Sequence, residues 1–329
     1  MTHAMRHAMT HAMRLAGAIA ALCLAGSAFA QGWPAKPVRV IVALPPGSGT
    51  DITGRAVAAS LAAQTGQPFV VENRPGASGS IAMNMVAKAD PDGYTILVMS
   101  SSWTVTPATV PGLPYDTLKD LSGITMLADI ANALAVRADR DIRSVKDLIA
   151  AAKANPGKMN AAVIGAGSAT HLTTERFRLG AGIDVLSVPY KGTPEALTDV
   201  LSGRVDYCFC PIGNVMPMVR DGRLRALAVS SKNRTSTQPD LPTTEEAGVA
   251  NSAQPFWVGM GVPAKTPREI VARLHAETLK ALNSPEIKAR WASLNQDVRV
   301  FTPEAFDALL RDEVASNAKL VKEANIQAN

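Results

Sequence analysis

The sequence predicts an α/β protein of two lobes with mostly parallel sheets. Short runs rich in valine and isoleucine alternate with alanine- and leucine-rich segments along almost the whole chain, as strands alternate with helices in such proteins. Turns rich in glycine and hydroxyl residues separate several of these pairs. Hydrophobic residues make up 47% of the 329 residues, which is enough for one large or two medium domains.

Nine apolar or β-branched runs of strand length are expected to form the sheets. They cover residues 38–44, 69–72, 95–99, 133–136, 160–164, 185–188, 205–209, 224–229 and 257–262. Segments with helical spacing lie between these runs, at 52–64, 80–88, 145–154, 170–179, 196–201 and 215–221. The tail is expected to be helical, because Pro267 and Pro285 open helices to 282 and 294 and Thr302 caps a last helix to about Glu323.

Two stretches are predicted to cross between lobes, at 129–137 and at 228–242, where the composition turns to Ser, Thr, Asn, Arg and Pro. A compact α/β unit lies between them. We therefore expect a discontinuous first lobe of residues 31–132 and 230–329, and a second lobe of residues 133–229.

The first 30 residues are predicted to be a signal peptide. Arg14 precedes an uncharged run, and Ala28-Phe29-Ala30 has the small-x-small pattern of a cleavage site, so the mature chain should be periplasmic and start at Gln31. The repeated Met1 to Arg14 segment fits either an extended leader or a translation start at Met13. Cys23 follows a leucine inside the apolar run, which argues against a lipoprotein.

Loss of this segment changes the residue counts that bear on function. Only His171 and His275 remain, so a histidine-built metal site is not expected. Removing Arg6 and Arg14 lowers the formal charge from +5 to about +3, which is too small an excess for a nucleic-acid surface.

Cys208 and Cys210 survive in an apolar stretch, and strand alternation would point both to one face. Two interpretations stay open: a pair of buried thiols, or a strained disulfide formed in an oxidising compartment. Two such ligands without a third do not make a metal site.

Four turns carry the pattern of a ligand site, because each follows a strand and opens a helix. They are residues 45–51, 75–80, 100–104 and 165–171. In open α/β sheets ligands bind beyond the carboxyl ends of strands, and the free N–H groups of a helix start favour an anion. Asp51 is expected mainly to cap the helix that begins at Ile52.

Nucleotide cofactors are not predicted. Residues 47–50 lack the lysine of a phosphate-binding P-loop, and Gly165-x-Gly167 lacks the third glycine of a dinucleotide fingerprint.

A secreted serine hydrolase is the alternative from another functional class. Ser168 and His171 share one turn, but the surrounding residues miss the Gly-x-Ser-x-Gly nucleophile elbow. A serine and a histidine three apart at a helix start commonly make cap contacts, and His275 is the only other histidine base.

The motifs, in their order along the chain, resemble those of the Bug (TctC-like) proteins, the extracytoplasmic solute receptors of tripartite tricarboxylate transporters. The resemblance covers about residues 33–326. It rests on Trp33-Pro34-x-Lys36-Pro37, Pro45-Pro46-Gly47-x-x-x-Asp51, Glu72-Asn73-Arg74-Pro75-Gly76, Asp92-Gly93-Tyr94, Leu113-Pro114-Tyr115-Asp116, Gly165 to Leu172, Val188-Pro189-Tyr190-Lys191-Gly192 and Leu224 to Val229.

This resemblance implies a type II periplasmic-binding-protein fold, with two lobes, a two-strand hinge and a small organic carboxylate or dicarboxylate trapped in a central cleft by Venus-flytrap closure. It further implies a monomer without catalytic activity that delivers its ligand to membrane permease subunits or to a sensor. The implied ligand-binding residues are Pro46, Gly47, Ser48, Gly49, Thr50 and Asp51 in one clamp, Ala166, Gly167, Ser168, Ala169 and Thr170 in the other, and Ser78, Ser101, Ser102, Trp103 and Cys210 along the cleft.

Two departures from the family pattern bear on the ligand. Ser48 stands where the family turn usually has a second glycine, and Cys210 stands where relatives often have an aspartate. Without that acid a ligand ammonium loses a partner, so a carboxylate without an amine is favoured. Trp103 and the Cys208 segment leave a neutral or aromatic ligand open.

Overall fold

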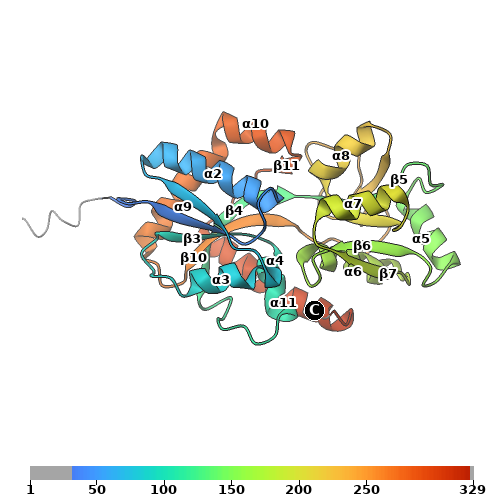
Figure 1. The fold of residues 1–329 in the computed structure, drawn as a ribbon, viewed down its shortest axis with the longest axis horizontal. Coiled ribbons are helices and arrows are strands. Elements are labelled where there is room, and N and C mark those ends of the chain that lie inside the picture. Colours follow the sequence, from blue (N-terminus) through green and yellow to red (C-terminus); the bar gives the residue numbers. More distant parts are fainter. Residues whose placement is uncertain (1–31, 327–329) are drawn as a thin grey trace, which may run out of the picture.

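The computed structural model describes residues 32–326, which form two α/β lobes lying end to end (Figure 1). Lobe 1 is built on a six-stranded sheet with the order β11-β4-β10-β3-β1-β2, and lobe 2 on a five-stranded sheet with the order β7-β6-β8-β5-β9. The two-lobe α/β architecture is as predicted. The predicted signal peptide lies outside the described residues.

Lobe 1 takes its elements from both ends of the chain. Its strands are β1 (Val38–Val42), β2 (Phe69–Asn73), β3 (Thr95–Ser100), β4 (Leu121–Ile130), β10 (Trp257–Pro263) and β11 (Gln296–Asp297). Its helices are α2 (Gly49–Thr65), the short 3-10 turn η2 (Ala77–Gly79), α3 (Ser80–Ala87), α4 (Ser102–Thr109), α9 (Arg268–Asn283), α10 (Pro285–Ser293) and α11 (Pro303–Glu323).

Lobe 2 is a single continuous stretch of chain. Its strands are β5 (Asn132–Arg137), β6 (Asn160–Ile164), β7 (Leu186–Tyr190), β8 (Tyr207–Pro211) and β9 (Leu224–Val229). Its helices are α5 (Val145–Ala154), α6 (Ala169–Ala181), α7 (Thr193–Ser202) and α8 (Ile212–Arg220).

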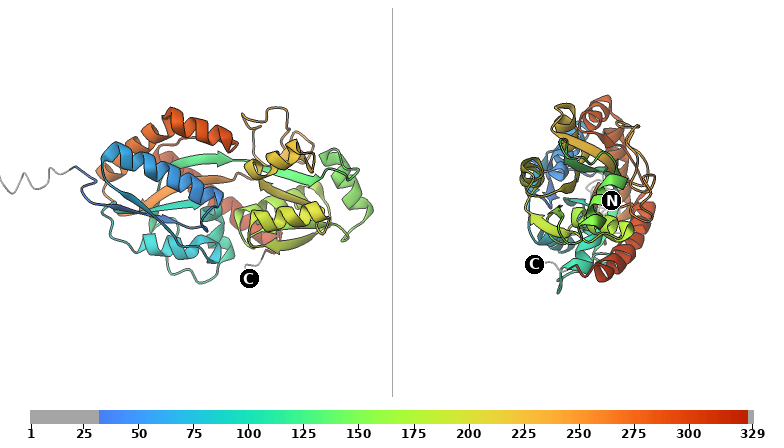
Figure 2. Two further views of the ribbon diagram at one scale, coloured as in Figure 1. Left: turned by 45° about the horizontal axis from the view of Figure 1, so that its top comes forward. Right: turned by 90° about the vertical axis from the view of Figure 1, so that its right-hand side faces the viewer.

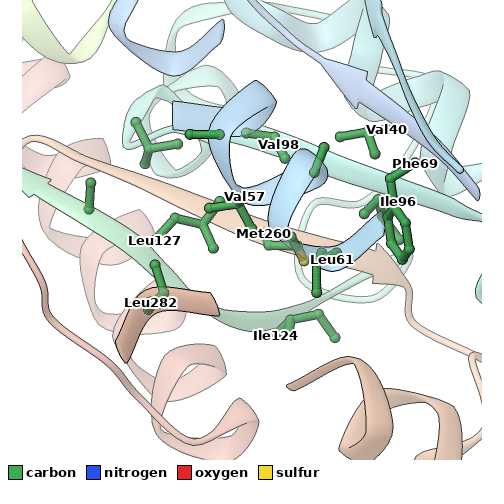
Figure 3. Close-up of a cluster of buried hydrophobic side chains, with 14 of the residues drawn as sticks. Val40, Val57, Leu61, Phe69, Ile96, Val98, Ile124, Leu127, Met260 and Leu282 are labelled. Carbon is green, nitrogen blue, oxygen red and sulfur yellow. The ribbon is translucent and has the colours of Figure 1, made fainter. Parts of the chain in front are cut away.

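Strand β1 is apolar along most of its length because helices cover both faces of the lobe 1 sheet. Val40 and Val42 point to one face, where they join Val57 and Leu61 of α2 in a core shared with α9 and α10 (Figure 3). Ile41 points to the other face, into a core formed with α3, α4 and α11. A strand buried on both sides has no polar face, which explains the nearly unbroken apolar run.

The two faces of the lobe 2 sheet are also both covered. On one face α6 packs through Phe177, whose ring lies 5.3 Å from that of Phe209 in an edge-to-face arrangement. On the other face α7 and α8 cover a cluster that contains Cys208 and Cys210. The predicted alternation is therefore correct, since Phe209 and its two neighbouring cysteines lie on opposite faces.

The expectation of mostly parallel sheets is wrong. Four strand pairings are parallel: β1 pairs with β2 and with β3, and β6 pairs with β7 and with β8. Five pairings are antiparallel: β10 pairs with β3 and with β4, β11 with β4, and β5 with β8 and with β9. The cause is the double crossing between lobes. The chain leaves lobe 1 through β4 and enters lobe 2 as β5, then returns from β9 to β10, and outgoing and returning strands pair side by side in opposite directions (Figure 2).

Several elements differ from the expectation. Strand β4, helix α4 and the short β11 were not predicted, and α2 begins at Gly49 rather than Ile52. Strand β8 lies two residues later than expected, at Tyr207–Pro211. The other predicted strands and helices are present with shifts at their ends.

Helix α11 extends from lobe 1 beneath the junction of the lobes (Figure 1). Its Leu320 and Val321 pack with Val105 of α4 and with Ala169 and Leu172 of α6, so one apolar cluster joins both lobes behind the crossing strands. Among the described helices, none is both long and apolar enough to cross a membrane.

Candidate functional site

The turns after β1, β3 and β6 lie at the junction between the lobes. Strand β1 lies between β2 and β3 in the sheet and is parallel to both. The chain first runs from β1 to β2 on one side and then crosses to β3 on the other side of β1. Such a point of reversed strand order, at the carboxyl ends of the strands, is where open α/β sheets bind ligands. We call residues 46–51, 78, 101–102 and 166–170 the interlobe site.

Hydrogen bonds connect the two sides of the interlobe site. Ser78 Oγ donates to the Ala166 carbonyl at 3.4 Å, and the Ala169 amide donates to Ser102 Oγ at 3.2 Å. Thr109 Oγ1, which the sequence analysis missed, donates to the Gly167 carbonyl at 3.1 Å. The structure therefore brings Ser78 and Ser102 against the 166–170 turn.

The first turn is shaped by Ser48 and a glycine with positive φ. Gly47 has φ +78°, in the left-handed region that favours glycine. Ser48 is the N-cap of α2, and its Oγ accepts from the Asp51 amide at 3.2 Å. Ser48, which the sequence analysis expects to depart from the family pattern, is thus the residue that starts the helix.

Asp51 organises this turn from inside the helix. Its carboxylate accepts from the Gly47 amide at 2.9 Å, from Asn73 Nδ2 at 2.8 Å and from Arg55 Nε at 3.1 Å. Burial raises the pKa of Asp51, but hydrogen bonds from Arg55, Asn73 and Gly47 outweigh it and hold the pKa below its usual range. The predicted capping of a helix at Ile52 is wrong, and both carboxylate oxygens are already engaged within lobe 1.

The first amides of α2 have no hydrogen-bond partner among the described residues. Gly49 and Thr50 are the first two residues of the helix, and their N–H groups donate to no other described residue. Thr50 Oγ1 is also buried without a hydrogen-bond partner, as is Ser101 Oγ before α4. The groups of Gly49 and Thr50 lie at the positive end of the α2 dipole, and Ser101 follows the neighbouring strand β3.

The 165–171 turn has the same construction in lobe 2. Ser168 is the N-cap of α6, and the amides of Ala166 and Thr170 donate to no other described residue. The Gly167 amide is occupied, because it donates to His171 Nδ1 at 3.0 Å. Two helix starts, those of α2 and α6, therefore open onto the interlobe site.

Ser168 and His171 do not form a nucleophile and base pair. Ser168 Oγ donates to the Ile164 carbonyl at 2.5 Å, and His171 Nδ1 accepts from the Gly167 amide. His171 Nε2 lies 3.8 Å from Glu175 Oε1. Burial raises the pKa of Glu175, but hydrogen bonds from His171, Ser187 and Arg178 outweigh this effect and lower the pKa to about 2. The carboxylate is therefore ionised and engaged by its neighbours. This geometry gives no support to the hydrolase alternative.

Two predicted cleft residues belong to the cores instead. Trp103 is fully buried, with its ring 6.2 Å from that of Phe306 in an edge-to-face contact. Cys210 is fully buried under α7 and α8 and is joined to Cys208 by a disulfide, with 5.7 Å between the two Cα atoms. The structure thus places the side chains of Trp103 and Cys210 in apolar clusters, whereas the predicted polar residues lie at the interlobe site.

Two other kinds of site bear on the rest of the described chain, metal clusters and surface depressions. Within residues 32–326 no group of three or more His, Cys, Asp or Glu side chains could hold a metal ion. Two shallow surface depressions, of about 390 and 410 Å³, lie away from the interlobe site. One is lined by Pro107, residues 110–113 and 115–118, and Val314, and the other by residues 32–34, the end of α2 and α9.

Comparison with known proteins gives consistent similarities. The model of the tripartite tricarboxylate transporter family receptor matches residues 53–326. Protein BugT of Bordetella pertussis is 34% identical over 307 residues, which cover 93% of this chain and 94% of BugT.

Two solved structures of Rhodopseudomonas palustris proteins are also similar. The protein Rpa4515, solved with adipate, is 32% identical with a TM-score of 0.82. The match covers 90% of this chain and 99% of the Rpa4515 chain. MatC, solved with bound malate, is 29% identical with a TM-score of 0.77 and covers 88% of this chain and 100% of its own.

Proposed function

Because the chain belongs to the receptor family of tripartite tricarboxylate transporters, we propose that it captures a small organic carboxylate between its two lobes in the periplasm. The observation that carries this proposal is the pair of helix starts at the interlobe site. The free amides of Gly49 and Thr50 and those of Ala166 and Thr170 supply hydrogen-bond donors from both lobes. Donors and helix dipoles of this kind favour an anion.

The ligand is a carboxylate without an amine. The interlobe site offers hydrogen-bond donors, which suit a carboxylate. An ammonium would need a free acceptor, but the carboxylate of Asp51 already accepts from Gly47, Asn73 and Arg55. Relatives solved with adipate and malate bind acids of this class.

Closure would use the two crossings as a hinge. Residues 31–132 with 230–329, and residues 133–229, would move as two lobes about the strands that join β4 to β5 and β9 to β10. Contacts such as those of Ser78 with Ala166 and of Ser102 with Ala169 would form on closing. Small-angle scattering with and without ligand should detect compaction in the bound state.

Delivery to membrane permease subunits, by a monomeric receptor, completes the proposal. The presequence would be cleaved near Ala30, and N-terminal sequencing of protein purified from the periplasm checks this. Deleting the gene should abolish uptake of the ligand by whole cells, and the Ser168 turn should serve binding only, without turnover.

The decisive experiment measures ligand binding to protein freed of carried-over ligand by unfolding and refolding. The panel holds adipate, malate, succinate, citrate, aspartate and benzoate. An acid present at 100 times its Kd should raise the free energy of unfolding by about 2.7 kcal/mol. Stabilisation by aspartate alone, or by none of the acids, would refute the proposed ligand class.

A further inference from the structure

Asn132, the first residue of β5, carries a buried side-chain amide that has no partner. The residue is fully buried, and neither Nδ2 nor Oδ1 makes a hydrogen bond within the described chain. Its backbone is engaged, since the carbonyl accepts from the Ser230 amide at 2.9 Å. Buried amides in proteins are nearly always paired, because an unpaired one loses its hydration without compensation. Any partner of these two atoms therefore lies outside the described chain.

The register of the strands places this amide beside the interlobe site. Asn132 lies opposite Pro211, so β5 begins at the end of the sheet where β8 finishes. Strand β6 is parallel to β8 and finishes at the same end, where the chain continues into α6. Alternation along β5 puts Asn132 on the same face as Leu134, which packs with Phe177 of α6. Asn132 therefore lies on the face that α6 covers, at the end of the sheet where α6 starts.

Among the buried lobe 1 side chains without a hydrogen-bond partner, two belong to the interlobe site. Thr50 Oγ1 and Ser101 Oγ are buried without partners, and each residue is only 1% exposed. A Cβ on neighbouring Gly49 would lie 3.9 Å from Cδ1 of Ile130, two residues before Asn132. The starts of α2, α4 and β5 thus each contribute an unsatisfied polar group near the first crossing.

The chemistry of these groups restricts the ligand. A carboxylate can accept from Thr50, Ser101 and Asn132 Nδ2, but it cannot donate to Asn132 Oδ1. An ammonium could donate to Oδ1 but would leave Nδ2 unpaired. A hydroxyl group both donates and accepts, so it satisfies both atoms of the amide.

We infer that the ligand carries a hydroxyl group in addition to its carboxylate, and that Asn132 is the residue that recognises this hydroxyl. The inference rests on the proposed function and specifies its substrate class as hydroxycarboxylates. Discrimination would come from the buried amide, which an acid without the hydroxyl leaves unpaired.

The test compares acids that differ by one group. Isothermal titration of the ligand-stripped protein would use succinate against malate and glutarate against 2-hydroxyglutarate, with aspartate and glutamate as ammonium analogues. For at least one pair, the hydroxylated acid should bind roughly tenfold or more tightly than its parent. In Asn132→Leu this preference should fall to near unity.

Stability measurements separate recognition from a structural role. Asn132→Leu replaces an unpaired amide by an apolar group of similar size, so the ligand-free variant should unfold at the same temperature or higher. Asn317→Leu is the matched control, because that buried amide is paired, donating to Thr104 Oγ1 at 3.0 Å and accepting from Gln254 at 3.5 Å. Asn317→Leu should unfold at a lower temperature and keep the preference for the hydroxyl.

The outcomes distinguish the proposed carboxylate receptor from the proposed role of Asn132. If no carboxylate binds the wild type, the proposed function fails. If carboxylates bind but the hydroxyl never strengthens binding, the inference about Asn132 is overturned while the carboxylate receptor stands. If ligand-free Asn132→Leu loses stability as Asn317→Leu does, Asn132 is a structural residue and the inference is likewise overturned.

Discussion

The Glu313 carboxylate on α11 lies 3.0 Å from Nε1 of Trp257 on β10, and its other oxygen lies 2.9 Å from Thr104 Oγ1. Thr104 Oγ1 is also placed to donate to the Ser101 carbonyl at 2.9 Å and accepts from Asn317. One hydroxyl hydrogen cannot serve both Ser101 and Glu313. A protonated Glu313 removes this conflict, because its own hydroxyl can donate to Thr104.

Burial is the main cause that raises the pKa of Glu313, to about 7. The nearby charge of Asp129 adds to this rise, while hydrogen bonds from Trp257 and Thr104 and the charge of Arg176 oppose it. Because the folded state holds a proton that the unfolded chain loses near pH 4.5, the stabilising contribution is complete below that pH. It is lost as the pH rises to about 7.

We therefore expect Glu313→Gln to remove a pH dependence of stability. Between pH 5 and pH 8 the wild type should lose on the order of 2 kcal/mol more of its free energy of unfolding than the variant, since glutamine stays neutral. Urea unfolding at both pH values measures this difference. Equal pH dependence in the two proteins would show that Glu313 is ionised in the fold.

The backbone of the first turn predicts different effects for two neighbouring glycines. Gly47→Ala forces a side chain onto φ +78° and should cost roughly 1–2 kcal/mol of stability. Gly49 has ordinary helical geometry, and a Cβ there would meet only Ile130 Cδ1 at 3.9 Å, so Gly49→Ala should change stability by no more than about 0.5 kcal/mol.

Ligand binding should separate these variants further. The methyl group of Gly49→Ala points toward the first crossing, where the proposed ligand lies, so it should weaken binding of the best acid of the panel although the fold is intact. Calorimetry at a temperature where all variants are folded checks this. Unchanged affinity in Gly49→Ala would argue that the start of α2 does not contact the ligand.

Trp103 should behave as a core residue. Trp103→Ala should cost about 3–5 kcal/mol, because it leaves a cavity against Phe306. Trp103→Phe should cost less and keep the affinity for the same acid within about twofold, since the fully buried ring packs against Phe306. A large loss of affinity in a stably folded Trp103→Phe would restore Trp103 to the cleft.

Local patterns predicted most elements of the fold, but not those that tertiary contacts stabilise. Helix α4 contains Pro107 and three threonines, which are weak helix formers. It forms because its apolar residues pack into two cores and because Thr106 Oγ1 lies 2.8 Å from the Ser78 carbonyl of the preceding turn. Strand β4 contains Gly123, whose amide donates to Asp307 of α11 at 2.6 Å. Neither partner is visible in the local sequence.

The candidate site shows the same limit. The two helix starts could be predicted because glycine and hydroxyl residues after a strand mark them in sequence. The placing of Trp103 and Cys210 could not, because the choice between cleft and core depends on Phe306 and on the helices of lobe 2. Asn132 was missed because a single asparagine at a strand start has no distinctive pattern. Its unpaired amide becomes evident only once the surrounding chain is in place.

Ser168 gives the sharpest distinction between receptor and hydrolase. As the N-cap of α6 its hydroxyl accepts from the His171 amide at 3.4 Å, so Ser168→Ala should cost about 0.5–2 kcal/mol of stability. Ser144→Ala is a matched control, since Ser144 caps α5 and accepts from the Asp147 amide at 3.1 Å. Both variants should unfold at lower temperature, but only Ser168→Ala should weaken binding of the acid.

Activated esters such as p-nitrophenyl acetate should be hydrolysed by the wild type and Ser168→Ala at the same background rate, because Ser168 Oγ donates to a carbonyl and His171 Nδ1 is occupied. Turnover in the wild type that Ser168→Ala abolishes would establish a catalytic serine.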